Sequence, residues 1–249
     1  MSNIVDPSRE ITYGRGNLSF TSVNLPRIAI RSHGDLDWFF EDLDRKIDLV
    51  IDQLLDRFRI QCAKRVRNYP FLMGEGVWID SEKLGPDDEV GEVLKHGTLT
   101  LGFIGLAECL KALIGSHHGE SEEAQNLGLE IVGHMRKRMD EASEKYHLNF
   151  SLIATPAEGL SGRFVRMDRA RYGVIPGVNG QATAENGQGR LGVEGVVDGG
   201  ADGEGQVTDH QPRLPLLIGG GAGLDAVFAV GVHRQAAAAA QGHLRAVLA

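Results

Sequence analysis

The sequence changes character near Asn179, and only the part before this point has the side chains that a packed core needs. Of the 33 glycines, 15 lie in residues 180–249, where no lysine occurs and Phe228 is the only aromatic residue. A segment with so little large apolar surface cannot offset the entropy lost on ordering. We therefore expect a folded part, residues 1–179, followed by a disordered Gly/Ala-rich tail.

Two origins of the tail are open. A stretch rich in Gly, Ala, Val, Arg and His but without lysine is typical of GC-rich coding sequence translated out of frame. The other possibility is an evolved glycine-rich module, but no internal repeat supports it. We favour the first and expect at most a helix around the alanine run Ala236–Ala240.

The folded part alternates helices with short strands. Residues 35 to about 66 predict one long amphipathic helix, because apolar residues recur at spacings of three and four. Leu99–Leu106, interrupted by Gly102, predicts a buried strand followed by a helix. Ser121 is a plausible N-cap of a helix that runs to about Tyr146, and Asn149–Ala154 predicts another strand. This order favours an α/β barrel or a layered α/β sheet over a sandwich.

Bulk properties exclude several classes of protein. The formal net charge of -8 gives no electrostatic case for binding nucleic acid. No stretch of about 18 apolar residues predicts a membrane span, and the polar N-terminus lacks the apolar region of a signal peptide. The only cysteines, Cys62 and Cys109, lie far apart and do not suggest a disulfide scaffold or a four-cysteine zinc site. A cytoplasmic location fits best.

Both cysteines fall on apolar helix faces, so packed thiols are a better interpretation than nucleophiles. His117 and His118 could ligate a metal, but no third ligand is evident, and an exposed loop is the better interpretation. His96 precedes Gly97 and could cap a turn or line a cavity, and the sequence does not decide between these roles.

A glycine-bracketed polar turn, Gly14–Asn17, leads into a strand-like run. The glycines permit a backbone that other residues resist, and the Asn17 amide can both donate and accept hydrogen bonds. Asn17 is therefore a candidate site residue. The competing interpretation is a tight turn whose amide bonds its own backbone.

A second candidate site is the loop Ala154–Gly162. A strand ends here, small residues follow, and a helix is expected to start, so exposed backbone N–H groups could bind an anion. Thr155 and Ser161 add hydroxyl groups, and Gly159 would let a phosphate approach. Glu158 argues against a pure phosphate loop, and a capped strand–helix turn is the alternative.

Several long motifs, in this order, resemble the catalytic barrel of the anaerobic (class III, glycyl-radical) ribonucleoside-triphosphate reductases. The resemblance covers residues 2 to about 179, and its motifs are Gly14–Pro26, Asn68–Trp78, Leu94–Leu106, His117–Ser121 and Asn149–Phe164. It implies an α/β fold that is part of the family's ten-stranded barrel, with the tail non-homologous.

The resemblance also implies roles for particular residues. Asn17 would be a catalytic-site residue near the substrate ribose. Thr155, Ala157, Gly159 and Ser161 would receive the phosphates of a ribonucleoside triphosphate. Since one nucleotide must be held at both places, we expect Asn17 and the loop to face one cavity.

The rest of the family chemistry is expected to lie outside this chain. A thiyl-forming cysteine precedes the motif carried here by Asp6–Glu10, and a glycyl radical and a zinc site lie near the family's C-terminus. The intact enzyme is implied to be a homodimer that uses formate and is activated by a radical S-adenosylmethionine activase. We expect this chain to be inactive alone. The alternatives are a non-catalytic nucleotide-binding fragment or the product of a truncated or frameshifted gene.

Overall fold

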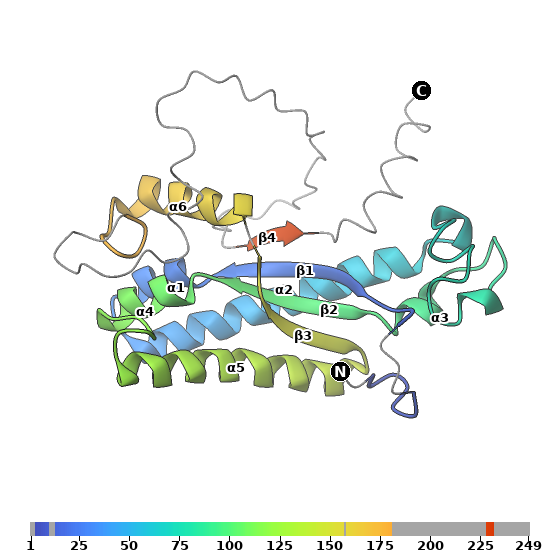
Figure 1. Cartoon of the computed structure of the whole chain (residues 1–249), viewed down its shortest axis with the longest axis horizontal. Helices are drawn as coiled ribbons and strands as arrows, with labels where there is room; N and C mark the ends of the chain where they lie inside the picture. Colours follow the sequence, from blue (N-terminus) through green and yellow to red (C-terminus); the bar gives the residue numbers. More distant parts are fainter. Residues whose placement is uncertain (1–2, 10–12, 157, 181–227, 232–249) are drawn as a thin grey trace, which may run out of the picture. The chain divides into compact units, whose positions relative to one another are not determined.

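The computed structural model describes residues 3–9, 13–156, 158–180 and 228–231. The chain divides into two compact units, Met1–Pro156 with Phe228–Ala249, and Ala157–Val227. The first unit contains the sheet and most of the helices (Figure 1). The second contains α6 (Glu158–Tyr172).

The sheet has the strand order β3-β2-β1-β4. Its strands are β1 (Asn17–Asn24), β2 (Thr98–Ile104), β3 (Asn149–Ala154) and β4 (Phe228–Gly231). β1, β2 and β3 run parallel, and β4 pairs with β1 in the antiparallel sense. Helices connect the parallel strands, which confirms the predicted α/β class. Within the described residues the sheet is open and therefore represents only part of a ten-stranded barrel.

The two long helices begin at polar caps. The Asp35 carboxylate accepts the Trp38 N–H at 3.0 Å at the start of α2 (Leu36–Cys62). Ser121 Oγ accepts the Ala124 N–H at 3.1 Å at the start of α5 (Glu122–Tyr146), as predicted. α2 ends four residues earlier than expected. The chain there enters the 3-10 turn η1 (Val66–Asn68), where the Val66 N–H donates to the Asp88 carbonyl at 3.0 Å.

Shorter elements complete the first unit. These are α1 (Leu25–Ser32), the 3-10 turn η2 (Ser81–Lys83), α3 (Gly91–Leu94) and α4 (Leu106–Ile114). None of the helices in the described residues is long and apolar enough to cross a membrane.

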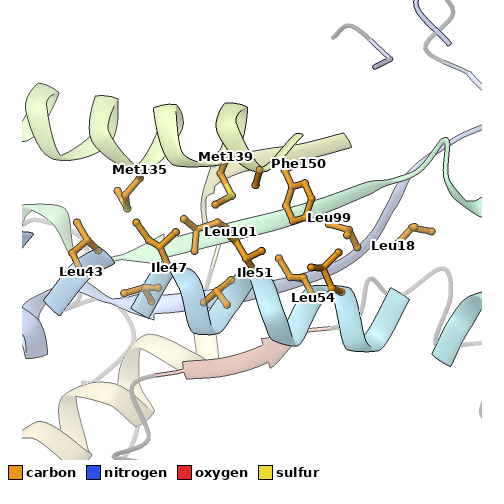
Figure 2. Packing of buried hydrophobic residues seen from close by; sticks show 14 of the residues in the cluster. Leu18, Leu43, Ile47, Ile51, Leu54, Leu99, Leu101, Met135, Met139 and Phe150 are labelled. Atoms are coloured by element: carbon orange, nitrogen blue, oxygen red, sulfur yellow. The ribbon is translucent and has the colours of Figure 1, made fainter. Parts of the chain in front are cut away.

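The core lies between the sheet and the pair α2 and α5, which cover the same face of the sheet (Figure 1). Figure 2 shows the apolar side chains that meet there, among them Leu43, Ile47, Ile51, Leu54, Leu99, Leu101, Met135, Met139 and Phe150. The cysteines pack in helices, as predicted. Cys109 is fully buried in α4, and burial raises the pKa of the half-buried Cys62 thiol to about 11.

The expectation of a disordered tail is wrong at Phe228–Gly231. These residues form β4, which pairs with Phe20–Val23 of β1. The outer edge of β1 offers unpaired N–H and C=O groups, and a short apolar run can satisfy them by adding a strand. The rest of the tail, including the alanine run, lies outside the described residues.

Candidate functional site

The sheet face turned away from α2 and α5 carries small polar side chains. Leu99 and Leu101 enter the core, so the alternate residues of β2 point to the opposite face. Thr100 is one of them, and its Oγ1 lies 2.8 Å from Ser151 Oγ on the neighbouring strand. Both residues are buried. Hydroxyl groups of neighbouring strands therefore meet on this face, next to Phe20, which pairs with Thr100.

At the carboxyl end of the strands, a second hydroxyl pair spans β2. Ser22 of β1 lies 2.7 Å, Oγ to Oγ1, from Thr155, which follows β3. Between them lies Gly102, where an added Cβ would be 2.2 Å from Thr155 Oγ1 and 2.6 Å from Ser22 Oγ. A glycine is thus required for this contact. The Thr155 N–H donates to the Phe103 carbonyl at 3.0 Å, so this N–H is already used in extending the sheet.

At the amino end of the same strands, Asn17 pairs with Thr98, and Thr98 pairs with Asn149. Paired residues of neighbouring strands share a face, so these side chains form one row. The Asn17 side chain is half-buried, and its Oδ1 is buried without a hydrogen-bond donor among the described residues. An orphaned carbonyl oxygen of this kind is costly unless something supplies a donor.

Asn149, two strands from Asn17 in the same row, is the centre of a buried network. Its Nδ2 lies 3.1 Å from Asn3 Oδ1 and 3.2 Å from the His96 carbonyl, and its Oδ1 accepts the Ile4 N–H at 2.9 Å. Asn3, His96 and Asn149 are 3%, 6% and 7% exposed. Burial lowers the pKa of His96, which favours the neutral imidazole.

The predicted site residues do not all meet. Asn17 and Thr155 belong to one sheet face but to its opposite ends: Asn17 lies level with Asn149, and Thr155 follows six residues later, about 20 Å along the strand. These two side chains do not meet within the first unit, and the expectation that Asn17 and the whole loop face one cavity stays a prediction, because the loop from Ala157 onward belongs to the second unit. The physical reason is that Asn17 begins its strand, whereas Thr155 follows the end of a strand parallel to it.

The other predicted phosphate-binding residues belong to the second unit. Gly159 and Ser161 lie in the first turns of α6, and Ala157 lies outside the described residues. No heavy atom lies within 4 Å of a Cβ added at Gly159, so its surroundings are open. The predicted strand–loop–helix order is confirmed.

Sequence reasoning missed four residues of this face, namely Asn3, Ser22, Gly102 and Asn149. Gly102 carried a signal, because a glycine inside an apolar strand often marks a close approach. The other three carried none, since isolated Asn and Ser residues are common.

The described residues contain no group of three or more His, Cys, Asp or Glu residues that could hold a metal ion. His117 instead lies 3.3 Å from Glu120, which also pairs with Lys111 at 2.9 Å. This loop joins α4 to α5, as predicted for His117 and His118. The zinc that the family resemblance implies has no fitting site in this part of the chain.

A model of the family described as anaerobic ribonucleoside-triphosphate reductase matches residues 2–187. The chain belongs to this family. The Escherichia coli K12 relative is 38% identical over 172 residues, which are 68% of this chain and 24% of that protein. The phage T4 relative is 33% identical over 175 residues, 68% of this chain and 27% of that protein.

Solved structures agree on the fold. The anaerobic ribonucleotide reductase from Thermotoga maritima in complex with dATP and CTP is 21% identical, with a TM-score of 0.50. The match covers 64% of this chain and 25% of that one. This reductase-family chain thus spans about a quarter of the length of the relatives it matches.

Proposed function

We propose that this chain supplies a substrate-facing part of the barrel in an anaerobic ribonucleoside-triphosphate reductase. The intact enzyme would reduce ribonucleoside triphosphates to deoxyribonucleotides by radical chemistry. The family match supports the reaction class. The observation that carries the assignment of the site is the orphaned Asn17 Oδ1, together with the polar sheet face on which it lies.

Asn17 would bind the ribose. Its buried carbonyl oxygen needs a donor, and a ribose hydroxyl is one. Radical reduction requires the ribose hydroxyls to be held by neutral groups that are not themselves oxidised, and an amide meets this condition. In this role Asn17 orients the substrate, and the radical carries the difficult chemistry.

The start of α6 would bind the phosphates. The first turn of a helix has N–H groups without intrahelical partners, and its dipole favours an anion. Gly159 leaves space there, Ser161 adds a hydroxyl group, and Ala157 directly precedes the helix. Thr155 would hold this loop in place through its hydrogen bond to Ser22.

The remaining chemistry would come from other parts of the intact enzyme. Cys62 and Cys109 are packed in helices, and burial raises the pKa of both thiols, so neither is proposed as the thiyl cysteine. The glycyl radical, the zinc, formate as reductant, the radical S-adenosylmethionine activase and the homodimer are assigned to the whole enzyme. A cytoplasmic location is part of the same proposal.

The test is a chimera in which residues 3–179 replace the matching segment of the E. coli relative. With activase, S-adenosylmethionine and formate, the chimera should form deoxynucleotides, whereas this chain alone should form none. Asn17→Ala should lower turnover on the order of 100-fold, because a misplaced substrate reacts slowly. Asn126→Ala, on the exposed surface of α5, is the matched control.

Full turnover by the Asn17→Ala chimera would contradict the assigned role. A chimera that binds ribonucleotides without reducing them would favour the alternative, a nucleotide-binding segment without a part in catalysis. Deoxynucleotide formation by the isolated chain would show that Cys62 or Cys109 had been misjudged.

A further inference from the structure

The network around Asn149 has only one consistent arrangement of donors and acceptors. Asn149 Oδ1 accepts the Ile4 N–H, so its Nδ2 must face Asn3 Oδ1 and the carbonyls of residues 95–97. Asn3 Nδ2 then points at His96 Nδ1, 3.1 Å away. Since an amide nitrogen only donates, His96 Nδ1 must be unprotonated. One side chain of β3 thus ties the N-terminal segment to the loop before β2.

A second anchor holds the same N-terminal segment through Arg9. Its guanidinium donates to both carboxylate oxygens of Asp80, at 2.7 and 2.9 Å. Hydrogen bonds from Arg9 and then Lys83 keep the pKa of the Asp80 carboxyl well below its usual range. Asp80 has a φ of 62°, a left-handed conformation that is unfavourable for residues other than glycine and that Asp and Asn tolerate best. The left-handed backbone at Asp80 places its carboxylate within hydrogen-bond distance of the Arg9 guanidinium.

The residue next to Asp80 extends the anchor toward Asn17. The Ile79 N–H donates to the Gly14 carbonyl at 2.6 Å, and the Thr98 N–H donates to the Gly16 carbonyl at 3.0 Å. Gly14 itself has a positive φ of 69°. The turn that carries Asn17 is therefore hydrogen-bonded to Ile79, which precedes Asp80, and to Thr98, which follows the carbonyls that Asn149 contacts.

We propose that Asp80 and Asn149 are positioning residues for Asn17. They clamp residues 3–9 at the amino end of the sheet and, through the Ile79 contact with Gly14, fix the turn from which the Asn17 amide projects. Neither residue needs to touch substrate. The inference rests on the proposed function only in naming Asn17 as the group that is positioned.

The first test measures amide hydrogen exchange in the full chain. Asp80→Asn keeps a residue that tolerates the left-handed conformation but loses the charge. Asn149→Asp keeps the acceptor for Ile4 and loses the donor. Both variants should raise exchange about tenfold in residues 3–9 and 13–17 and leave α5 unchanged. Asn126→Asp, on the exposed surface of α5, should change neither region.

Unchanged protection of residues 13–17 in Asp80→Asn would overturn the proposal, as would an equal loss of protection over the whole chain. If Asn149→Asp fails to fold, Asp80→Asn decides. In the chimera described above, Asp80→Asn should lower kcat about tenfold with KM unchanged, because positioning acts on the reacting geometry. A chimera without any activity would refute the proposed function and leave the exchange result standing.

Discussion

The two ends of the parallel strands are held together by different kinds of contact on one sheet face. At the amino end, Asn149, Asn3 and His96 connect segments far apart in the sequence through buried hydrogen bonds, and Asp80 adds a part-buried ion pair with Arg9. At the carboxyl end, one hydroxyl pair closes over Gly102, where a side chain is absent. The amino end depends on particular polar side chains, whereas the carboxyl end depends on the absence of a side chain at Gly102.

This difference shows how each end should respond to mutation. Removing a polar group at the amino end leaves its partners buried and unsatisfied, which costs free energy for each one. Adding a group at the carboxyl end forces packed atoms apart. The predictions below run from the largest expected effect on stability to the smallest.

Gly102→Ala should be the most damaging change, lowering the free energy of unfolding by about 3 kcal/mol. The new Cβ would overlap Thr155 Oγ1 and Ser22 Oγ and break their hydrogen bond. Urea denaturation followed by circular dichroism measures this loss of stability.

Gly133→Ala is the control, because nothing lies within 4 Å of a Cβ added at Gly133. It should stabilise α5 by about 0.5–1 kcal/mol. If Gly102→Ala and Gly133→Ala changed stability equally, the close contact over Gly102 would not distinguish the carboxyl end from the amino end.

Asn149→Ala should lower the free energy of unfolding by about 2 kcal/mol, because it orphans the Ile4 N–H and Asn3 Oδ1. The same urea titration measures the loss. Asn126→Ala, exposed on α5, should change stability by less than about 0.5 kcal/mol. If Asn149→Ala is as mild as this control, the amino-end network does not contribute to stability.

His96 should make stability depend on pH, with a smaller effect than Asn149→Ala. Burial, the largest cause, lowers the His96 pKa, while Asp80 and Asp6 raise it and Lys95 and Arg9 lower it further. The unfolded chain therefore takes up the proton first. The contribution of His96 to the free energy of unfolding is complete above about pH 6.5, the ordinary pKa of histidine. It is lost as the pH falls from there toward the folded-state pKa.

The measurement compares urea midpoints of the wild type and His96→Gln between pH 5 and pH 8. The difference between the two proteins should shrink as the pH falls, since glutamine does not titrate. His118→Gln, an exposed histidine, should follow the wild type. Parallel curves for wild type and His96→Gln would show that His96 does not titrate with folding.

Asn17→Ala should have the smallest effect on stability, within about 0.5 kcal/mol of the wild type. It removes a buried oxygen that has no donor among the described residues, so no partner is left unsatisfied there. Calorimetric unfolding of both proteins tests this. A large destabilisation would mean that the Asn17 amide holds the fold, contrary to its proposed role with substrate.

Local patterns in the sequence were sufficient for the elements of the fold. The apolar spacing predicted α2, Ser121 predicted the start of α5, and Asn149–Ala154 was recognised as a strand. These features depend on neighbours a few residues apart, and the backbone hydrogen bonds and helix caps that produce them are equally local. The motifs in Gly14–Pro26 and Asn149–Phe164 also predicted the family.

Only the tertiary structure decided which groups meet. Asn149 contacts Asn3 across 146 positions, and Ser22 contacts Thr155 across 133. Parallel pairing sets the second contact, because strand register determines which distant residues share a row, and the first depends on the packing of the N-terminal segment against the start of β3. The same register placed Asn17 and Thr155 at opposite ends of one face. A sequence shows which residues can bond, but their partners are selected by a sheet whose strands are joined through long helical connections.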